Sequence, residues 1–145
     1  MAAYKFRLQK VLDLRETIES EKKNEFGLAM KRLENEKEKM RQLEAEMESY
    51  CGEFEENTAK GILVDQLKVI LNSIEYYKRN IKNQAVKIKM AQDYLETCRQ
   101  ELIKATQERK MMEKLKEIDY KKYLYSEQKK EEKIVDDLVS FKESK

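Results

Sequence analysis

The chain has 145 residues, of which 41% are charged, and its 31 basic and 29 acidic residues leave a formal net charge of +2. So small a net charge excludes a strong overall attraction to nucleic acid or to an anionic membrane. The lack of His and Pro excludes histidine chemistry and proline kinks within helices. Because many Lys and Glu residues accompany a thin apolar stripe, we expect an elongated all-α chain without a thick globular core.

The N-terminal stretch MAAYKFRLQKVLDLRE is charged throughout, so we expect no secretory signal. No segment reaches the ~20 apolar residues that a membrane-spanning helix requires. We therefore expect a cytoplasmic protein without a transmembrane segment.

The first predicted helix covers about residues 4–57 and carries a seven-residue apolar repeat. Two adjacent rows make up this repeat: Leu12, Phe26, Leu33, Met40, Met47 and Phe54 in one, and Leu8, Ala29, Leu43 and Tyr50 in the other. Glu19 and Lys22 also occupy positions of the pattern, which leaves the register near the N-terminus open. A competing row in that region consists of Tyr4, Val11 and Ile18.

The predicted turn covers about residues 58–64. Asn57, Thr58 and Gly61 are turn-forming residues at the end of the first apolar repeat. Gly61 can adopt the left-handed conformation that commonly ends a helix.

The second predicted helix covers about residues 65–142 and has the more regular repeat. Its two rows are Leu67, Ile74, Ile81, Ile88, Leu95 and Leu102, and Ile70, Tyr77, Gln84, Ala91, Cys98, Ala105 and Met112. So long a heptad pattern favours a coiled coil over a core helix of a globular bundle. Arg109 occupies the next position of the first row, where an aliphatic residue is expected.

A short turn between two such helices predicts an antiparallel coiled-coil hairpin, with the C-terminal helix the longer, as a single domain over residues 1–145. With a turn centre near residue 60, Cys51 and Cys98 lie too far apart for a disulfide, and Cys98 fills the seam. Residues beyond about 116 have no partner in the first helix. Their apolar side chains form a partner surface or belong to a fraying end.

Charge is unevenly distributed along the sequence. Residues 42–59 contain six Glu and no basic residue, whereas residues 76–92 contain five basic residues and no acid. We interpret the basic run as a solvated helix face rather than a nucleic-acid strip. The acidic run is a candidate docking surface for a basic partner.

The sequence lacks the features of an enzyme. It contains no glycine-rich phosphate loop, and two cysteines without histidine do not supply a zinc site. We therefore expect no catalytic residue, no metal and no cofactor.

Two motifs, one near the N-terminus and one in the second predicted helix, carry a family resemblance. The stretch YKFRLQKVLDLRE and the stretch RQELIKATQERKMMEKLKEIDYKKY resemble the flagellar export protein FliJ along nearly the whole chain. Such proteins are non-catalytic components of the flagellar type III export apparatus, with a coiled coil similar to the central stalk of rotary ATPases.

The resemblance implies three partners: the hexameric flagellar export ATPase, the cytoplasmic domain of the export-gate membrane protein, and export chaperones. It implies a protein that is monomeric when free, binds no nucleic acid, and associates peripherally with the inner-membrane export apparatus. The residues that match the motifs are expected to contact the ATPase ring: Phe6, Arg7, Leu8, Val11, Leu12, Arg15, Glu108, Arg109, Lys110, Glu113, Lys114 and Leu115. Weaker candidates for gate contact, for which seam packing is the competing explanation, are Leu43, Tyr50, Phe54, Tyr77 and Gln84.

Two alternatives remain open at this point. One is the equivalent stalk protein of a virulence type III secretion system. The other is a generic self-associating coiled-coil scaffold without an ATPase partner.

Overall fold

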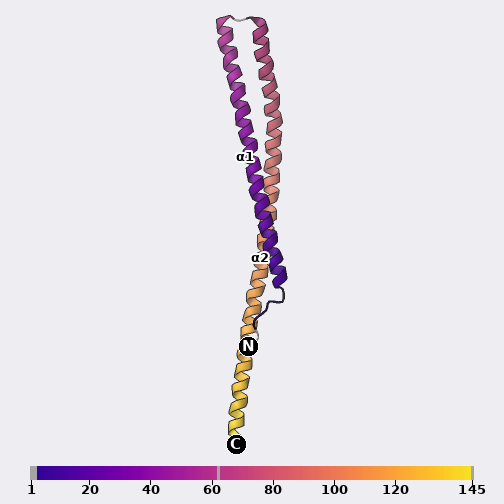
Figure 1. Ribbon diagram of the computed structural model, residues 1–145, viewed down its shortest axis with the longest axis vertical. Coiled ribbons are helices and arrows are strands. Elements are labelled where there is room, and N and C mark those ends of the chain that lie inside the picture. Colours follow the sequence, from indigo (N-terminus) through magenta and orange to yellow (C-terminus); the bar gives the residue numbers. More distant parts are fainter. Residues whose placement is uncertain (1–2, 62, 145) are drawn as a thin grey trace. The chain divides into compact units, whose positions relative to one another are not determined.

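The computed structural model describes residues 3–61 and 63–144 and contains two helices, α1 (Gln9–Lys60) and α2 (Val64–Glu143) (Figure 1). With 52 and 80 residues, the two helices are about 78 Å and 120 Å long at 1.5 Å per residue. The described residues include no strand. The fold is therefore all-α, and α2 is the longer helix, as the sequence predicts.

The contacts between α1 and α2 show that the hairpin is antiparallel. Arg109 pairs with Glu19 across 90 positions of the sequence, whereas Gln84 pairs with Glu36 across 48. The separation falls toward the turn, because residues that follow the turn meet residues that precede it. Antiparallel pairing of two helices is thus confirmed.

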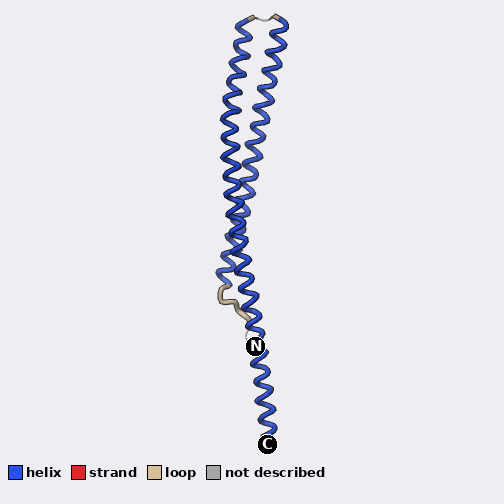
Figure 2. The backbone as a smooth tube through the Cα atoms, turned by 180° about the vertical axis from the view of Figure 1, so that it is seen from behind, coloured by secondary structure: helices blue, strands red, loops and turns tan. Residues whose placement is uncertain are grey.

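The ends of the helices differ in detail from the expected bounds. α1 begins at Gln9 rather than near residue 4, and Figure 2 shows the preceding residues as a loop. Phe6 is only 9% exposed, and its carbonyl accepts a hydrogen bond from the Gln9 amide at 3.1 Å. Tertiary contacts of this N-terminal segment thus take precedence over local helix propensity.

The turn between the helices is shorter than expected. α1 continues to Lys60, and Gly61 follows with φ of 70°. This left-handed conformation is the one predicted for Gly61, and it ends the helix without steric cost. Ile62 lies outside the described residues, and α2 begins at Val64.

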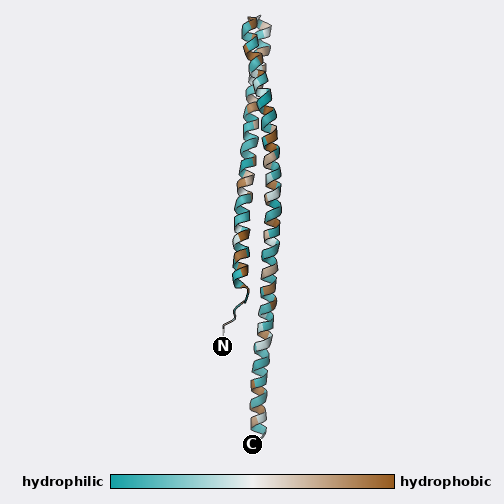
Figure 3. Ribbon diagram, turned by 90° about the vertical axis from the view of Figure 1, so that its right-hand side faces the viewer, coloured by the Kyte–Doolittle hydropathy of each residue, from teal (hydrophilic) through white to brown (hydrophobic). Residues whose placement is uncertain are grey.

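The chain divides into two compact units, and both helices contribute to each. Unit 1 comprises Met1–Lys22 and Leu102–Lys145, and unit 2 comprises Lys23–Glu101. Apolar residues are interspersed among polar ones along both helices (Figure 3). Among the described residues, no helix contains a stretch that is long and apolar enough to cross a bilayer.

The core of unit 2 is the predicted apolar seam. Its most buried members include small side chains, with Ala29, Ala91 and Cys98 each at most 2% exposed. Near the turn, the rings of Tyr50 and Tyr77 stack with centroids 5.5 Å apart. Both cysteines are free, and Cys98 fills the seam as predicted.

The exposure of residues in unit 1 shows which of the two competing rows near the N-terminus faces the seam. Leu12 is 3% exposed, whereas Val11 of the competing row is 37% exposed. Glu19, seven residues after Leu12, is 7% exposed. The row that contains Leu12 therefore continues through a buried carboxylate.

Candidate functional site

Arg109 and Glu19 form an ion pair between the two helices of unit 1. The Nε atom of Arg109 donates to both carboxylate oxygens of Glu19 at 2.9 Å, and its Nη1 atom lies 2.8 Å from Glu113 Oε1. These bonds, first to Glu19 and then to Glu113, raise the pKa of Arg109 above its ordinary value. Arg109 thus interrupts the apolar seam because α1 places a carboxylate in the seam as well.

The position of this pair corrects the expected facing residues. A turn centre near residue 60 places Arg109 opposite residue 11, but its guanidinium contacts Glu19. The turn lies between Lys60 and Val64, and the long Arg109 side chain extends along the seam. Opposite charges at two seam positions were the sequence signal for this contact.

Two further polar contacts join the helices of unit 1. Arg15 Nη1 donates to Glu108 Oε2 at 2.7 Å, and Lys116 Nζ donates to Gln9 Oε1 at 2.7 Å. Both contacts are partly buried, which protects them from full solvent screening. The two motifs are therefore joined by one ion pair and by one hydrogen bond from a charged donor.

The N-terminal segment packs on α2 through Tyr4. Its hydroxyl donates to Asp119 Oδ2 at 2.8 Å, and its ring lies 5.0 Å from Tyr120 and 5.1 Å from Tyr123, between centroids. Desolvation and the hydrogen bond to Asp119 raise the pKa of Tyr4 to about 12. The sequence motifs did not single out these aromatic contacts, although the cluster of tyrosines in residues 120–125 was visible.

The first and second motifs meet at one surface hollow. It has a volume of ≈ 390 Å³, and its lining includes Phe6, Arg7 and Leu8 from the N-terminal segment and Leu115 from α2. These residues are more than 100 positions apart in the sequence. Unit 1 therefore brings members of both motifs into a single site.

The twelve expected ATPase-contact residues differ in exposure. Phe6 and Leu12 are buried, and the partly buried ones are Leu8, Arg15, Glu108 and Arg109. The exposed ones are Arg7, Val11, Lys110, Glu113, Lys114 and Leu115.

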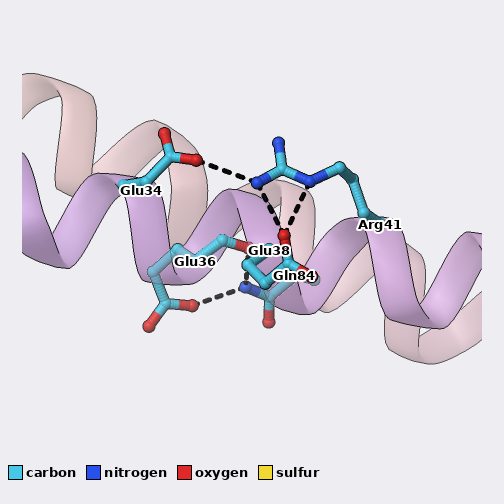
Figure 4. A network of polar contacts seen from close by, with 5 residues as sticks. All are labelled: Glu34, Glu36, Glu38, Arg41 and Gln84. Carbon is cyan, nitrogen blue, oxygen red and sulfur yellow. Dashed lines mark hydrogen bonds and ion pairs between the residues drawn. The ribbon is translucent and has the colours of Figure 1, made fainter.

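The five weaker candidates lie in the seam of unit 2. Leu43, Tyr50, Phe54 and Tyr77 are partly buried, and Gln84 is 5% exposed. Gln84 Nε2 donates to the backbone oxygen of Glu36 at 2.8 Å and also to its carboxylate, as Figure 4 shows. This bond lowers the pKa of Glu36. Gln84 thus supports the seam, which agrees with the packing explanation for that residue.

Comparison with known proteins identifies the family. The family model of the flagellar FliJ protein matches residues 4–144. The chain belongs to the FliJ family. This family belongs to flagellar type III protein transport. The family resemblance that the two motifs carry is thus confirmed over nearly the whole chain.

A solved structure shares the fold of this FliJ-family chain. It is described as that of the YscO homologue CT670 from Chlamydia trachomatis, with a TM-score of 0.79 and 22% sequence identity. The similarity covers 96% of this chain and 94% of that one. A comparison with curated protein sequences found no match.

Proposed function

We propose that this FliJ-family chain is a non-catalytic stalk and escort component of the flagellar type III export apparatus, which engages the hexameric export ATPase and activates it. The family match across residues 4–144 carries this proposal. The convergence of both motifs in unit 1 supports the assignment of ATPase contact to that unit. The chain would act in the cytoplasm, next to the inner-membrane export apparatus.

Within unit 1, the twelve residues divide into two roles. Buried and cross-paired residues such as Leu12, Arg15 and Arg109 set the geometry of the surface. Exposed residues such as Lys110 and Lys114 contact the ring. These two lysines form no ion pair with any described residue, so their ammonium groups are available to carboxylates or carbonyls of a partner.

Contact with the export gate is assigned to unit 2. Tyr50 and Tyr77 stack at the seam and are partly exposed. Their edges, with Leu43 and Phe54, offer an aromatic and aliphatic surface of the kind that anchors protein interfaces. Export chaperones are the third expected class of partner.

Hydrolysis by the purified cognate ATPase tests the proposal. The wild-type chain should raise the rate, and Lys110→Glu/Lys114→Glu should abolish the increase while helicity stays unchanged. The matched control is Lys31→Glu/Lys37→Glu, which makes the same charge change at two exposed positions of unit 2. Arg109 is unsuitable for this experiment because it pairs with Glu19.

Three results would contradict the proposal. The wild-type chain could leave hydrolysis unchanged, the control could behave like the unit 1 variant, or the chain could sediment as a stable parallel dimer. The last result would favour the self-associating scaffold. Activation of a virulence secretion ATPase in place of the flagellar one would assign the chain to that system.

A further inference from the structure

One exposed side of α2 in unit 2 carries both apolar and basic residues. Tyr76, Arg79, Val86 and Met90 follow one another at intervals of three, seven and four residues, which places them on one side of a helix. Tyr76 is 54% exposed, and Val86 and Met90 are each 59% exposed. We call this side, with the flanking Lys82, the basic face of α2.

The basic face lies away from the seam. Buried residues of the same stretch, such as Gln84 and Ala91, contact or face α1. Within the described part of unit 2, Val86 and Met90 are far more exposed than Gln84 and Ala91. The basic face is therefore an unpartnered helix surface.

The charge of this surface has one sign. Residues 76–92 contain five basic residues and no acid, and the run is bounded by Glu75 and Asp93. The only ion pairs of the run in the described structure are at its two ends, Lys78 with Glu75 at 3.7 Å and Lys89 with Asp93 at 2.9 Å. Arg79 and Lys82, near the middle of the basic face, have no acidic partner among the described residues.

Three kinds of anionic partner could meet such a surface. Nucleic acid would use the basic side chains but leave Val86 and Met90 without a role, because its phosphates offer no apolar contact. A partner helix with acidic residues would need an apolar stripe that recurs about every 3.5 residues, but between Tyr76 and Val86 this face presents Arg79 and Lys82. An anionic bilayer satisfies both features, since apolar side chains enter the interface while Lys and Arg extend their charges to the lipid headgroups.

We propose that the basic face of α2 binds the surface of an anionic lipid bilayer, with α2 lying along the membrane and Val86 and Met90 inserted among the headgroups. Electrostatic attraction supplies the specificity for anionic lipid, and the apolar residues set the depth. The small net charge of the whole chain is no obstacle, because screening limits the interaction to charges within about 8–10 Å of the surface. This lipid contact is separate from the proposed ATPase contact, which lies in unit 1.

Flotation with lipid vesicles tests the proposal on the full chain. Vesicles of phosphatidylcholine with phosphatidylglycerol should carry the chain upward at low salt, and vesicles of phosphatidylcholine alone should not. Arg79→Glu/Lys82→Glu should lower the partition coefficient at least ~30-fold, since each basic residue near an anionic surface contributes about 1 kcal/mol. The control Lys31→Glu/Lys37→Glu, with the same charge change in α1, should retain at least a third of the wild-type binding.

A tryptophan reporter tests the geometry. The chain contains no Trp, so Tyr76→Trp provides a single fluorophore on the basic face, and Tyr125→Trp, at a 63% exposed position of unit 1, provides the matched control. Anionic vesicles should shift the emission of the first to shorter wavelength and leave the second unchanged. Val86→Ser/Met90→Gln should reduce the shift while circular dichroism stays helical.

Several outcomes would overturn the lipid proposal. Equal losses for the two charge-reversal variants would mean that only bulk charge matters. Equal shifts for the two Trp variants would place the contact elsewhere. Displacement of vesicles by single-stranded DNA at equal phosphate concentration would assign the basic face to nucleic acid, and displacement by a helical Glu-rich peptide would assign it to an acidic protein.

Discussion

The two units use the same helix pair but fill its seam with different chemistry. In unit 1, the buried Glu19 meets Arg109, and Arg15 meets Glu108. In unit 2, Ala29, Ala91 and Cys98 occupy the most buried positions. The difference indicates that packing supplies most of the stability of unit 2, whereas charge fixes the register of unit 1.

Unit 2 is not wholly apolar, however, and its polar layer is instructive. Gln84 reaches Glu36, and nearby Arg41 binds Glu34 and Glu38 on the solvent side of α1 (Figure 4). The Gln84 amide donates to two acceptors of Glu36 on the facing helix without introducing a second charge. A neutral partner therefore specifies alignment at lower desolvation cost than an ion pair does.

The largest expected effect comes from removing one member of the unit 1 ion pair. Arg109→Leu should lower the urea midpoint of unfolding more than the truncation of an apolar seam residue does, because the buried Glu19 carboxylate would lose its ion pair with Arg109. The double variant Glu19→Leu/Arg109→Leu should recover most of the loss. A matched control is Arg99→Leu, since Arg99 pairs with Glu96 on an exposed face of α2.

This experiment also tests the role of the pair in register. The double variant should be nearly as stable as the wild type but should activate the ATPase less, if the charges align the two motifs. A double variant that stays as destabilised as Arg109→Leu would show that the pair does not act as a unit. Equal losses for Arg99→Leu and Arg109→Leu would remove the distinction between buried and exposed pairs.

The next largest loss of stability should come from truncating a buried apolar residue of unit 1. Leu12→Ala should cost about 3 kcal/mol of unfolding free energy, because Leu12 is 3% exposed and its truncation leaves a cavity in the core of unit 1. The neighbouring Val11→Ala, at a 37% exposed position, is the control and should cost less than half as much. Equal costs would mean that the competing row contributes equally to the seam.

Enlarging a small seam residue of unit 2 should lower the unfolding free energy by a smaller amount. Ala91→Leu should cost about 2 kcal/mol, because Ala91 is 1% exposed and a larger side chain forces the helices apart. Ala85→Leu, at an exposed position of the same helix, is the control and should be nearly neutral. Denaturation with urea, followed by circular dichroism, measures both. No loss for Ala91→Leu would show that unit 2 is loosely packed.

Most of the fold could be predicted from the sequence because one periodicity dominates it. All members of the two rows in α2, from Leu67 through Met112, are buried or partly buried. Gly61 marked the turn for a local reason, its tolerance of positive φ. The start of α1 could not be predicted in the same way, since contacts of Tyr4 and Phe6 with distant parts of the chain decide it.

The candidate site was predictable only in part. The two motifs identified which segments belong to it, but not which residues hold the hairpin together. Arg109 illustrates this limit, because its guanidinium reaches Glu19, eight residues from the expected residue 11, whereas Arg15 and the neighbouring Glu108 pair only three residues from the expected alignment. Lys110, the next residue, is exposed by the rotation of the helix alone.

The smallest expected effects are losses of stability at alkaline pH, and they involve one tyrosine in each unit. The pKa of Tyr4 in unit 1 and the pKa of Tyr77 in unit 2 are both raised from 10.0 to about 12, for Tyr4 chiefly by desolvation and for Tyr77 chiefly by a hydrogen bond to Glu46. A raised pKa in the folded state means that each phenol stabilises the fold fully below pH 10, and that this contribution is lost as the pH rises from 10 to 12.

Tyr4→Phe and Tyr77→Phe should each weaken the loss of helicity over this interval, and phenolate absorbance should report two fewer late-titrating groups in the double variant. Titration of both groups near pH 10 in the wild type would contradict the contacts assigned to them. A difference between the single variants would show which unit opens first at high pH, and we expect unit 1, because Tyr4 anchors a non-helical segment whereas Tyr77 belongs to a continuous helix.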